Sequence, residues 1–219
     1  MVAELTGRNS LRASIDEVAS RDPVLADLVG RVGPIRHRPR DPDGPFAALV
    51  RAIVFQQLAG RAAQAIYGRV RAVVGDTLTP ATLNATSDET LRAAGLSGNK
   101  LASLRDLSVK VLDGTVVLSR TSRRSDEELI ERLTTVRGIG RWTAEMYLMF
   151  QLRRLDVWPV DDLGVRQGYA LAWELDRPPT PKQLEPLGER FRPYRSIVAR
   201  YCWAAVPLLH PGGTAATLR

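Results

Sequence analysis

Residues 133–166, LTTVRGIGRWTAEMYLMFQLRRLDVWPVDDLGVR, contain a short glycine turn between an amphipathic segment and an apolar one. Gly138 and Gly140, one residue apart, let the backbone turn sharply and leave peptide N–H groups uncovered by side chains. The next predicted helix begins at Gly140, so its first N–H groups lack intrahelical partners and carry the positive end of the helix dipole. The stretch therefore predicts two helices joined by a turn that suits a phosphate.

An acidic pair, Asp161 and Asp162, follows this turn and directly precedes another predicted helix. Taken alone, an aspartate in this place is most simply explained as the cap of that helix, because Asp is a favoured N-cap residue. A carboxylate at a helix start can also face a cleft and act as a fixed anion or as a base toward water. The residues alone leave both interpretations open.

Composition limits the class of protein. The 219 residues carry 31 Lys and Arg against 24 Asp and Glu, a formal net charge of +7. This excess fits either an ordinary basic surface or a polyanionic partner. Cys202 is the only cysteine, which excludes an intrachain disulfide and a four-cysteine iron–sulfur cluster. The N-terminal residues carry charges throughout, and the longest apolar run, 201–209, is about half a membrane span. We expect a cytoplasmic protein that does not bind membranes.

Helical periodicity dominates the chain, and no strand alternation recurs. Ser125 and Glu128 have the spacing of a capping box, and a basic, turn-rich connector occupies residues 31–45. The predicted helices cover residues 10–20, 23–29, 46–57, 60–74, 87–95, 100–112, 127–135, 141–152 and 162–175, one that opens at 180–181, and 194–205. The sequence therefore predicts an all-α protein.

The string VRGIGRWTA, residues 136–144, resembles the hairpin of the helix-hairpin-helix (HhH-GPD) DNA glycosylases, LxxxPGIGxxTA, with Arg137 in place of the usual proline. The Asp pair and a later Arg-Pro-Tyr-Arg-Ser segment ending in Trp203 make the resemblance strongest to the AlkA-type alkylbase glycosylases (DNA-3-methyladenine glycosylase II), over roughly residues 20–205. The resemblance implies two helical lobes with a DNA-binding cleft. About 46–135 would form a central lobe, and about 1–45 plus 136–219 a second lobe with the hairpin exit helix and the catalytic Asp. We expect a short form without the N-terminal β domain.

The implied activity is that of a monofunctional glycosylase. It would flip alkylated bases of the 3-methyladenine and 7-methylguanine type out of duplex DNA and hydrolyse the bond between base and sugar. Asp162 aligns with the catalytic carboxylate, which stabilises positive charge on the deoxyribose. Trp142 occupies the position at which bifunctional relatives carry a Schiff-base lysine, so we expect no lyase activity. His37 and His210, in a basic connector and a proline-rich tail, are weaker candidates for a catalytic base.

Trp203 aligns with an aromatic residue that stacks on the flipped base, where an indole face attracts a cationic base. Further residues predicted to line the base pocket are Trp142, Met146, Phe55 and Tyr194. A place in the hydrophobic core explains each tryptophan equally simply. Met146 stands where related enzymes carry a tyrosine, and Tyr147 lies about 100° further round the helix.

The segment FQQLAG, residues 55–60, resembles the GQQxS wedge segment of the family. Gln57, or alternatively Leu58, would fill the gap left by the extruded nucleotide, although two glutamines that bond exposed carbonyls at a helix end explain the same letters. The residues predicted to hold the DNA backbone are Gly138, Ile139, Gly140, Arg141 and Thr143. Arg36, Arg38, Arg40 and Arg166 add to the basic surface or are ordinary solvated side chains. We expect no required cofactor, and a structural Na⁺ or K⁺ would bind hairpin carbonyls, at Leu133 and Val136.

We expect a monomer that acts on damaged duplex DNA and associates with the nucleoid if the cell is bacterial. Two other hypotheses stay open. One is a helix-hairpin-helix DNA-binding module without catalysis. The other is a glycosylase for a different lesion, such as hypoxanthine, ethenoadenine or a mismatched base, which the departures at Met146 and Phe55 favour.

Overall fold

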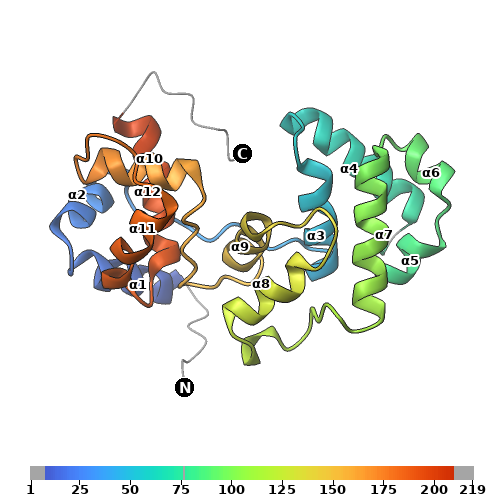
Figure 1. Ribbon diagram of the computed structural model, residues 1–219, viewed down its shortest axis with the longest axis horizontal. Coiled ribbons are helices and arrows are strands. Elements are labelled where there is room, and N and C mark those ends of the chain that lie inside the picture. The colour runs from blue at the N-terminus through green and yellow to red at the C-terminus, as the bar shows by residue number, and fades with distance from the viewer. Residues whose placement is uncertain (1–7, 76, 210–219) are drawn as a thin grey trace. The chain divides into compact units, whose positions relative to one another are not determined.

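The computed structural model describes residues 8–75 and 77–209, which contain helices and no strand. The chain divides into two compact units: unit 1 comprises residues 8–38 and 153–209 of the described chain, and unit 2 residues 39–152. Unit 1 contains α1 (Arg8–Ala19), α2 (Pro23–Val32), α10 (Leu163–Ala172), α11 (Pro181–Leu187), the 3-10 helix η2 (Glu189–Phe191) and α12 (Arg195–Leu209) (Figure 1). Unit 2 contains α3 (Gly44–Phe55), α4 (Gly60–Val74), α5 (Pro80–Ala85), α6 (Asp88–Ala93), α7 (Gly98–Leu112), η1 (Thr121–Arg123), α8 (Asp126–Thr134) and α9 (Arg141–Phe150).

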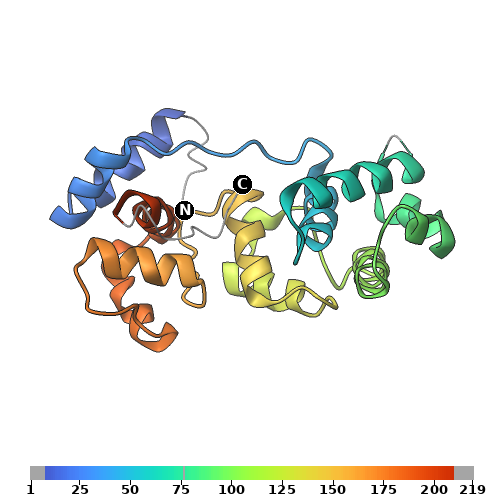
Figure 2. The same ribbon diagram turned by 90° about the horizontal axis from the view of Figure 1, so that it is seen from above.

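The boundary between the units differs from the predicted one. Residues 136–152, which hold the hairpin and α9, were expected in the lobe with Asp162 but belong to unit 2. The physical reason is the apolar face of α9, which packs against α8 and α3. Figure 2 shows α9 lying alongside α8. The chain therefore leaves unit 2 after α9, between the hairpin and the acidic pair.

α12 is the central helix of unit 1, and α10 and α2 pack against it (Figure 1). Gly168 permits the close approach of α10, because a Cβ at this position would lie 1.8 Å from the Cys202 carbonyl oxygen. Cys202 is fully buried, and burial raises the pKa of its thiol. The single cysteine is thus a core residue at a tight helix crossing. The buried side chains of α12 include Ile197, Val198, Tyr201, Ala205 and Val206.

α3 is the central helix of unit 2 and is apolar around most of its circumference, as a buried helix should be. α4, α7 and α9 pack against it, and α5 and α6 lie beside α7 (Figure 1). Its buried side chains are Phe46, Ala47, Leu49, Val50, Ile53 and Val54. None of the helices within residues 8–75 and 77–209 has the length and apolar character that a membrane span requires.

Two local details differ from the sequence expectation. α5 was not predicted, although Thr79 caps it in a reciprocal box with Thr82 and Pro80 opens it; a helix of six residues is too short to show periodicity. At α8, the Ser125 hydroxyl accepts from the Glu128 N–H at 3.1 Å as predicted. The Glu128 carboxylate pairs instead with Arg124 and Arg132, so only half of the expected capping box forms.

Candidate active site

Asp162 is both the cap of α10 and a buried acid. Its Oδ1 atom accepts one hydrogen bond from the Val165 N–H at 2.8 Å and a second from the Trp203 indole Nε1–H at 2.8 Å. The residue is 8% exposed. The two interpretations left open by the sequence are therefore compatible: the cap holds the carboxylate in place, and the indole is a second, independent support.

The crossing of α10 and α12 brings Trp203 to this carboxylate. Gly164, in the first turn of α10, lies beneath the indole: a Cβ there would be 2.9 Å from Trp203 Cδ1 and 3.2 Å from Asp162 Oδ1. The indole thus occupies space that any side chain at Gly164 would need. Its Nε1–H binds Asp162, and because Trp203 is only partly buried, part of the indole surface stays accessible.

The Arg-Pro-Tyr-Arg-Ser segment fixes the chain that leads to Asp162. Arg195 Nε donates to Asp156 Oδ1 at 2.8 Å. Ser196 donates its backbone N–H to the Leu155 carbonyl at 2.9 Å, and its hydroxyl accepts from the Val157 N–H at 2.9 Å. These bonds hold residues 155–157 against the start of α12. The segment therefore anchors the loop that leads from residue 155 to Asp161 and Asp162.

Tyr194, predicted to line the base pocket, makes polar contacts with α1, and its place in a base pocket stays a prediction. Its hydroxyl donates to Glu17 Oε2 at 2.7 Å, and the Arg21 guanidinium lies 5.6 Å from its ring centroid. Phe55 of unit 2 is also engaged in packing: its ring meets Tyr67 edge to face, with centroids 6.4 Å apart, and Arg51 lies 4.4 Å above it. Each aromatic side chain packs within its own unit, Tyr194 on α1 and Phe55 on α4.

The hairpin of unit 2 rests on α7. Gly138 has φ +78°, a backbone conformation that suits glycine, and a Cβ on it would lie 2.6 Å from Ser103 Oγ. The Arg137 N–H, which the usual proline would lack, donates to Asp106 Oδ2 at 2.7 Å. Desolvation raises the pKa of Asp106, but hydrogen bonds from Lys110 and Arg137 outweigh it, so this pKa is lowered overall. Arg137, which stands where the family usually has proline, thus adds one hydrogen bond that holds the hairpin on α7.

Arg141, predicted to contact the DNA backbone, uses its side chain within unit 2. Its guanidinium pairs with both carboxylate oxygens of Glu127, at 2.7 and 2.8 Å, and with buried Glu145 at 3.1 Å. These ion pairs raise its pKa further above the ordinary arginine value, led by the bond to Glu127. The side chain is committed within the protein. Phosphate binding would therefore depend on backbone N–H groups near Gly140, which gives α9 no side-chain cap.

Some of the other predicted residues of α9 are exposed and others are buried. Trp142 is 42% exposed, and Met146, one turn later on the same face, is partly exposed. Tyr147 is buried, its hydroxyl has no hydrogen bond, and burial raises its pKa. Tyr147, one position after the place where related enzymes carry a tyrosine, is thus a core residue of unit 2. Thr143 and Ile139 are also buried.

The predicted wedge residues lie on an exposed turn between α3 and α4. Gln57 has φ +55°, and Leu58 is 39% exposed. A non-glycine residue in the left-handed region carries backbone strain, which occurs preferentially at functional sites. Exposure and strain together support the wedge assignment at this turn, and the choice between Gln57 and Leu58 stays a prediction.

Replacing Gln57 with glycine tests this assignment. Glycine adopts the left-handed conformation without steric cost, so the free energy of unfolding should stay unchanged or rise by up to about 1 kcal/mol. Loss of the side chain should weaken binding to a duplex with one abasic site by about 10-fold, because the gap is no longer filled. Thermal melting and fluorescence anisotropy measure the two effects. A less stable variant with unchanged affinity would argue against a wedge at Gln57.

The remaining predicted positions are the two carbonyls proposed to bind a cation, Arg166 and His210. The Leu133 and Val136 carbonyls accept backbone bonds from Val136 and Ile139, at 3.1 and 3.0 Å. Arg166 is partly buried, with Nη1 3.5 Å from the Pro179 carbonyl. No group of three His, Cys, Asp or Glu side chains in the described ranges has the arrangement of a metal site. His210 lies outside the described residues.

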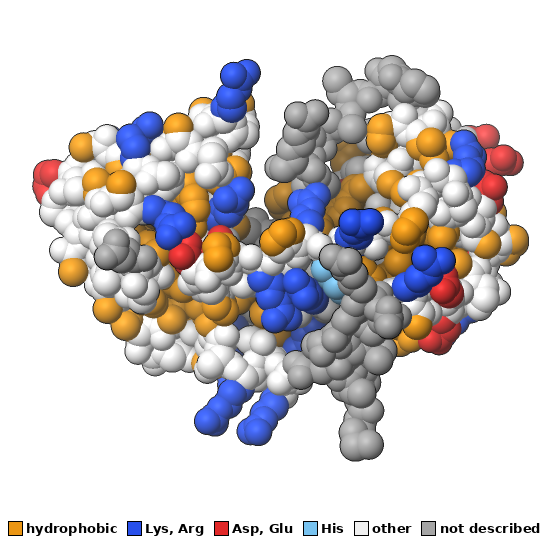
Figure 3. Space-filling model, turned by 180° about the vertical axis from the view of Figure 1, so that it is seen from behind, with side chains coloured by type: hydrophobic (Ala, Val, Ile, Leu, Met, Phe, Trp, Pro, Cys, Tyr) orange, Lys and Arg blue, Asp and Glu red, His pale blue; other side chains and the backbone are white. Residues whose placement is uncertain are grey.

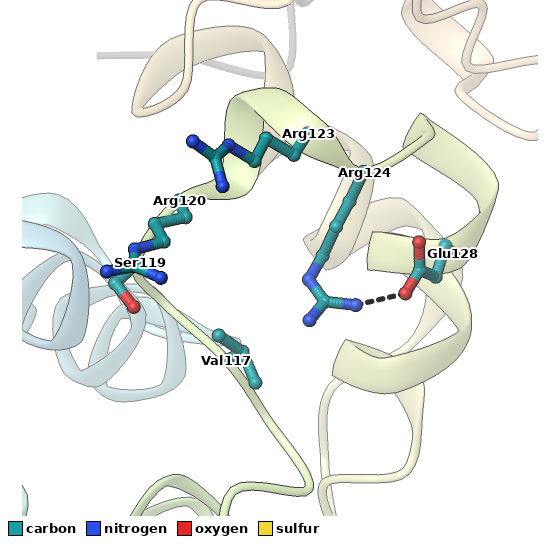
Figure 4. A pocket seen from close by; sticks show the side chains of 6 residues that line it. All are labelled: Val117, Ser119, Arg120, Arg123, Arg124 and Glu128. Carbon is teal, nitrogen blue, oxygen red and sulfur yellow. Dashed lines mark hydrogen bonds and ion pairs between the residues drawn. The ribbon is translucent and has the colours of Figure 1, made fainter.

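The arginine side chains of the connector between α2 and α3 are exposed on the surface. Arg36, Arg38 and Arg40 of the connector are exposed, and Figure 3 shows Lys and Arg side chains standing out from one face of the molecule. A hollow of about 580 Å³ lies next to η1 and α8 in unit 2 (Figure 4). Val117, Ser119, Arg120, Arg123, Arg124 and Glu128 line it. It contains none of the predicted site residues.

These features define the class of protein. Residues 50–193 match the family model described as HhH-GPD superfamily base excision DNA repair protein, so the chain belongs to that family. It is 37% identical over 206 residues to DNA-3-methyladenine glycosylase 1 of Schizosaccharomyces pombe, with 93% of this chain and 88% of that protein covered. The predicted family and the all-α fold are confirmed.

Two solved structures are similar to the chain over most of its length. One is DNA-3-methyladenine glycosidase from Bacillus halodurans, with a TM-score of 0.81, 36% identity and 88% of each chain covered. The other is the 3-methyladenine DNA glycosylase of S. pombe in complex with abasic DNA, with a TM-score of 0.75 and 34% identity. That match covers 94% of this chain and 99% of the other.

Proposed function

We propose that the chain is a monofunctional DNA glycosylase that excises alkylated bases, of the 3-methyladenine and 7-methylguanine type, from duplex DNA in base excision repair. The observation that carries the proposal is the buried Asp162 carboxylate, held by the α10 N-terminus and by Trp203 in a chain of the HhH-GPD family. The 37% identity to a 3-methyladenine glycosylase supports the choice of substrate class.

The chemistry requires one fixed anion. When the bond between C1′ and the base nitrogen breaks, the base leaves with the electron pair and positive charge develops on the sugar. The Asp162 carboxylate stabilises that charge and accepts a proton from water as the water oxygen bonds to C1′. A base that is cationic through alkylation leaves as a neutral molecule, so no strong general acid is required. Trp203, with its exposed part toward the base, adds attraction for the cation.

Strand cleavage is not expected. A lyase forms a Schiff base between a lysine amine and the sugar, and the indole of Trp142 has no such nucleophile. The product is therefore an abasic site in an intact strand. No cofactor is required for hydrolysis. We propose that a structural Na⁺ or K⁺ would bind hairpin carbonyls, at Leu133 and Val136, because carbonyl oxygens are suitable ligands for such ions.

The protein would act as a monomer on damaged duplex DNA, in the cytoplasm, and would associate with the nucleoid if the cell is bacterial. Asp162 and Trp203 lie in unit 1, and the hairpin and the wedge turn lie in unit 2. Phosphate contacts at the hairpin would give affinity without sequence preference.

A panel of duplexes tests the substrate class. Each carries one base: 7-methylguanine, ethenoadenine, hypoxanthine, a mismatched base or an undamaged base. Release of 7-methylguanine with strand breaks appearing only after alkali supports a monofunctional alkylbase glycosylase. Preferential release of another lesion would replace that substrate class, in keeping with Met146 at the expected tyrosine position. Tight binding without release from any duplex would favour a binding module.

Trp203→Phe separates the two roles of the indole. Phenylalanine keeps an aromatic face for the base but removes the Nε1–H that donates to Asp162 at 2.8 Å. A hydrogen bond to a charged group contributes about 1.5–3 kcal/mol, so the single-turnover rate should fall about 10- to 100-fold. Affinity for an abasic duplex should change little. Trp203→Ala removes both roles and should be slower still; an unchanged rate in Trp203→Phe would show that the hydrogen bond has no part in catalysis.

A further inference from the structure

One side chain connects the wedge turn to the hairpin within unit 2. Gln56 Nε2 donates to the Gly138 carbonyl oxygen at 2.9 Å and lies 3.5 Å from Thr143 Oγ1. Gln56 and Gly138 are 82 positions apart in sequence, so this bond is tertiary. Gln56 directly precedes Gln57, and Thr143 lies in the first turn of α9. The contact thus joins the element predicted to enter the duplex to the element predicted to hold its backbone.

The Gly138 peptide is held from both sides. Its carbonyl accepts from Gln56, and the N–H of the same peptide group, that of Ile139, donates to the Val136 carbonyl at 3.0 Å. Gly138 itself has no room for a side chain beside Ser103. Removing the Gln56 donor would therefore free one end of a peptide plane in the middle of the hairpin.

α7 makes hydrogen bonds both to the end of α3 before the wedge turn and to the hairpin. Lys100, in its first turn, donates to the Val54 carbonyl at 2.6 Å, at the end of α3 that leads into the wedge turn. Further along the same helix, Asp106 accepts from the Arg137 N–H at 2.7 Å. The wedge turn and the hairpin are thus each anchored on α7, and Gln56 bonds them directly to each other.

We propose that Gln56 is a positioning residue that couples insertion of the wedge to seating of the DNA backbone on the hairpin. The inference rests on the proposed function. The strained backbone at Gln57, φ +55°, is kept in place from the preceding residue by the Gln56 bond to Gly138. Without that bond the turn can relax, and the wedge no longer enters the duplex whenever the hairpin is occupied.

The test uses Gln56→Glu, which keeps the shape of the side chain but replaces the donor with an acceptor, and Gln56→Leu, which removes both. Gln64→Leu is the matched control, because Gln64 is an exposed glutamine of α4 in the same unit. The probe is a duplex with one tetrahydrofuran abasic site beside 2-aminopurine, whose fluorescence reports local unstacking. For either Gln56 variant we expect the equilibrium constant for insertion to fall roughly 3- to 10-fold, the range for loss of one hydrogen bond, with the melting temperature close to that of the wild type.

A double-mutant cycle separates coupling from a merely structural role. Alanine at both Gln57 and Leu58 truncates the wedge, and its effect on the aminopurine signal is measured with and without Gln56→Leu. Coupling predicts that truncation costs much less once Gln56 is gone. Additive losses, or a full aminopurine response in Gln56→Leu, would overturn the inference while base release by the wild type keeps the proposed function. Failure of the wild type to prefer the abasic duplex and to release any base would overturn both.

Discussion

Asp162→Asn should slow base release by about 10²- to 10⁴-fold, the range for loss of a group that stabilises charge in the transition state. The amide keeps the size of the side chain but carries no negative charge and cannot take a proton from water. Binding to an abasic duplex should stay within about 3-fold of the wild type, because phosphate contacts supply most of that affinity. Single-turnover rates at excess protein and anisotropy titrations measure the two quantities.

Asparagine is the informative replacement here because Asp162 also caps α10 through the Val165 N–H. Asn caps helices about as well as Asp, whereas alanine would cost about 1 kcal/mol of stability. Asp161→Asn is the matched control: this neighbour is exposed and makes the same change of charge one residue away. If Asp161→Asn lost activity and Asp162→Asn kept it, the assignment within the acidic pair would be reversed.

Gly168→Ala should cause the largest loss of stability among glycine replacements in unit 1. The new Cβ would lie 1.8 Å from the Cys202 carbonyl oxygen and 2.8 Å from its Cα. Both are backbone atoms that cannot rotate away, so α10 and α12 must move apart. We expect a loss of at least about 3 kcal/mol, which lowers the melting temperature by roughly 6–12 °C for a chain of this size.

Gly30→Ala is the control for this prediction. Gly30 lies in α2 of the same unit, and a Cβ there meets nothing within 4 Å. Alanine in an exposed helix is more stable than glycine by about 0.5–1 kcal/mol, so this variant should melt slightly higher than the wild type. A Gly168→Ala protein that melts at the wild-type temperature would show that the helices are further apart than the structure has them.

The helices were largely predictable because hydrophobic periodicity and the residues at helix starts indicate the same ranges. α4, at 60–74, matches the predicted range, and α2 follows the Pro23 signal. Asp162 was predicted as the catalytic carboxylate from its position after the hairpin; the structure shows that two donors hold one of its oxygens, and its role stays a prediction. Gly138 of the hairpin has the turn conformation expected of a glycine, with φ +78°, whereas Gly140 has an ordinary extended backbone.

Partner choice between distant residues was not predictable. Arg141 stays a predicted contact to the DNA backbone, but its guanidinium binds Glu127 on α8, which comes within reach only after folding, and Glu145, one turn further along α9. Tyr194 turns to Glu17 for the same kind of reason. Gln56 was passed over in favour of Gln57, since neighbouring identical letters give no sign of which side chain meets the hairpin. Such contacts depend on packing between segments far apart in sequence.

The most direct test of the central claim is a time course of base release from randomly methylated duplex DNA by the wild type and Asp162→Asn, with free bases identified by chromatography. The account predicts that the wild type alone releases 3-methyladenine or 7-methylguanine and leaves the strand intact until alkali is added. Equal release by both proteins, or no release by the wild type, would contradict the assignment of Asp162 as the catalytic carboxylate of an alkylbase glycosylase.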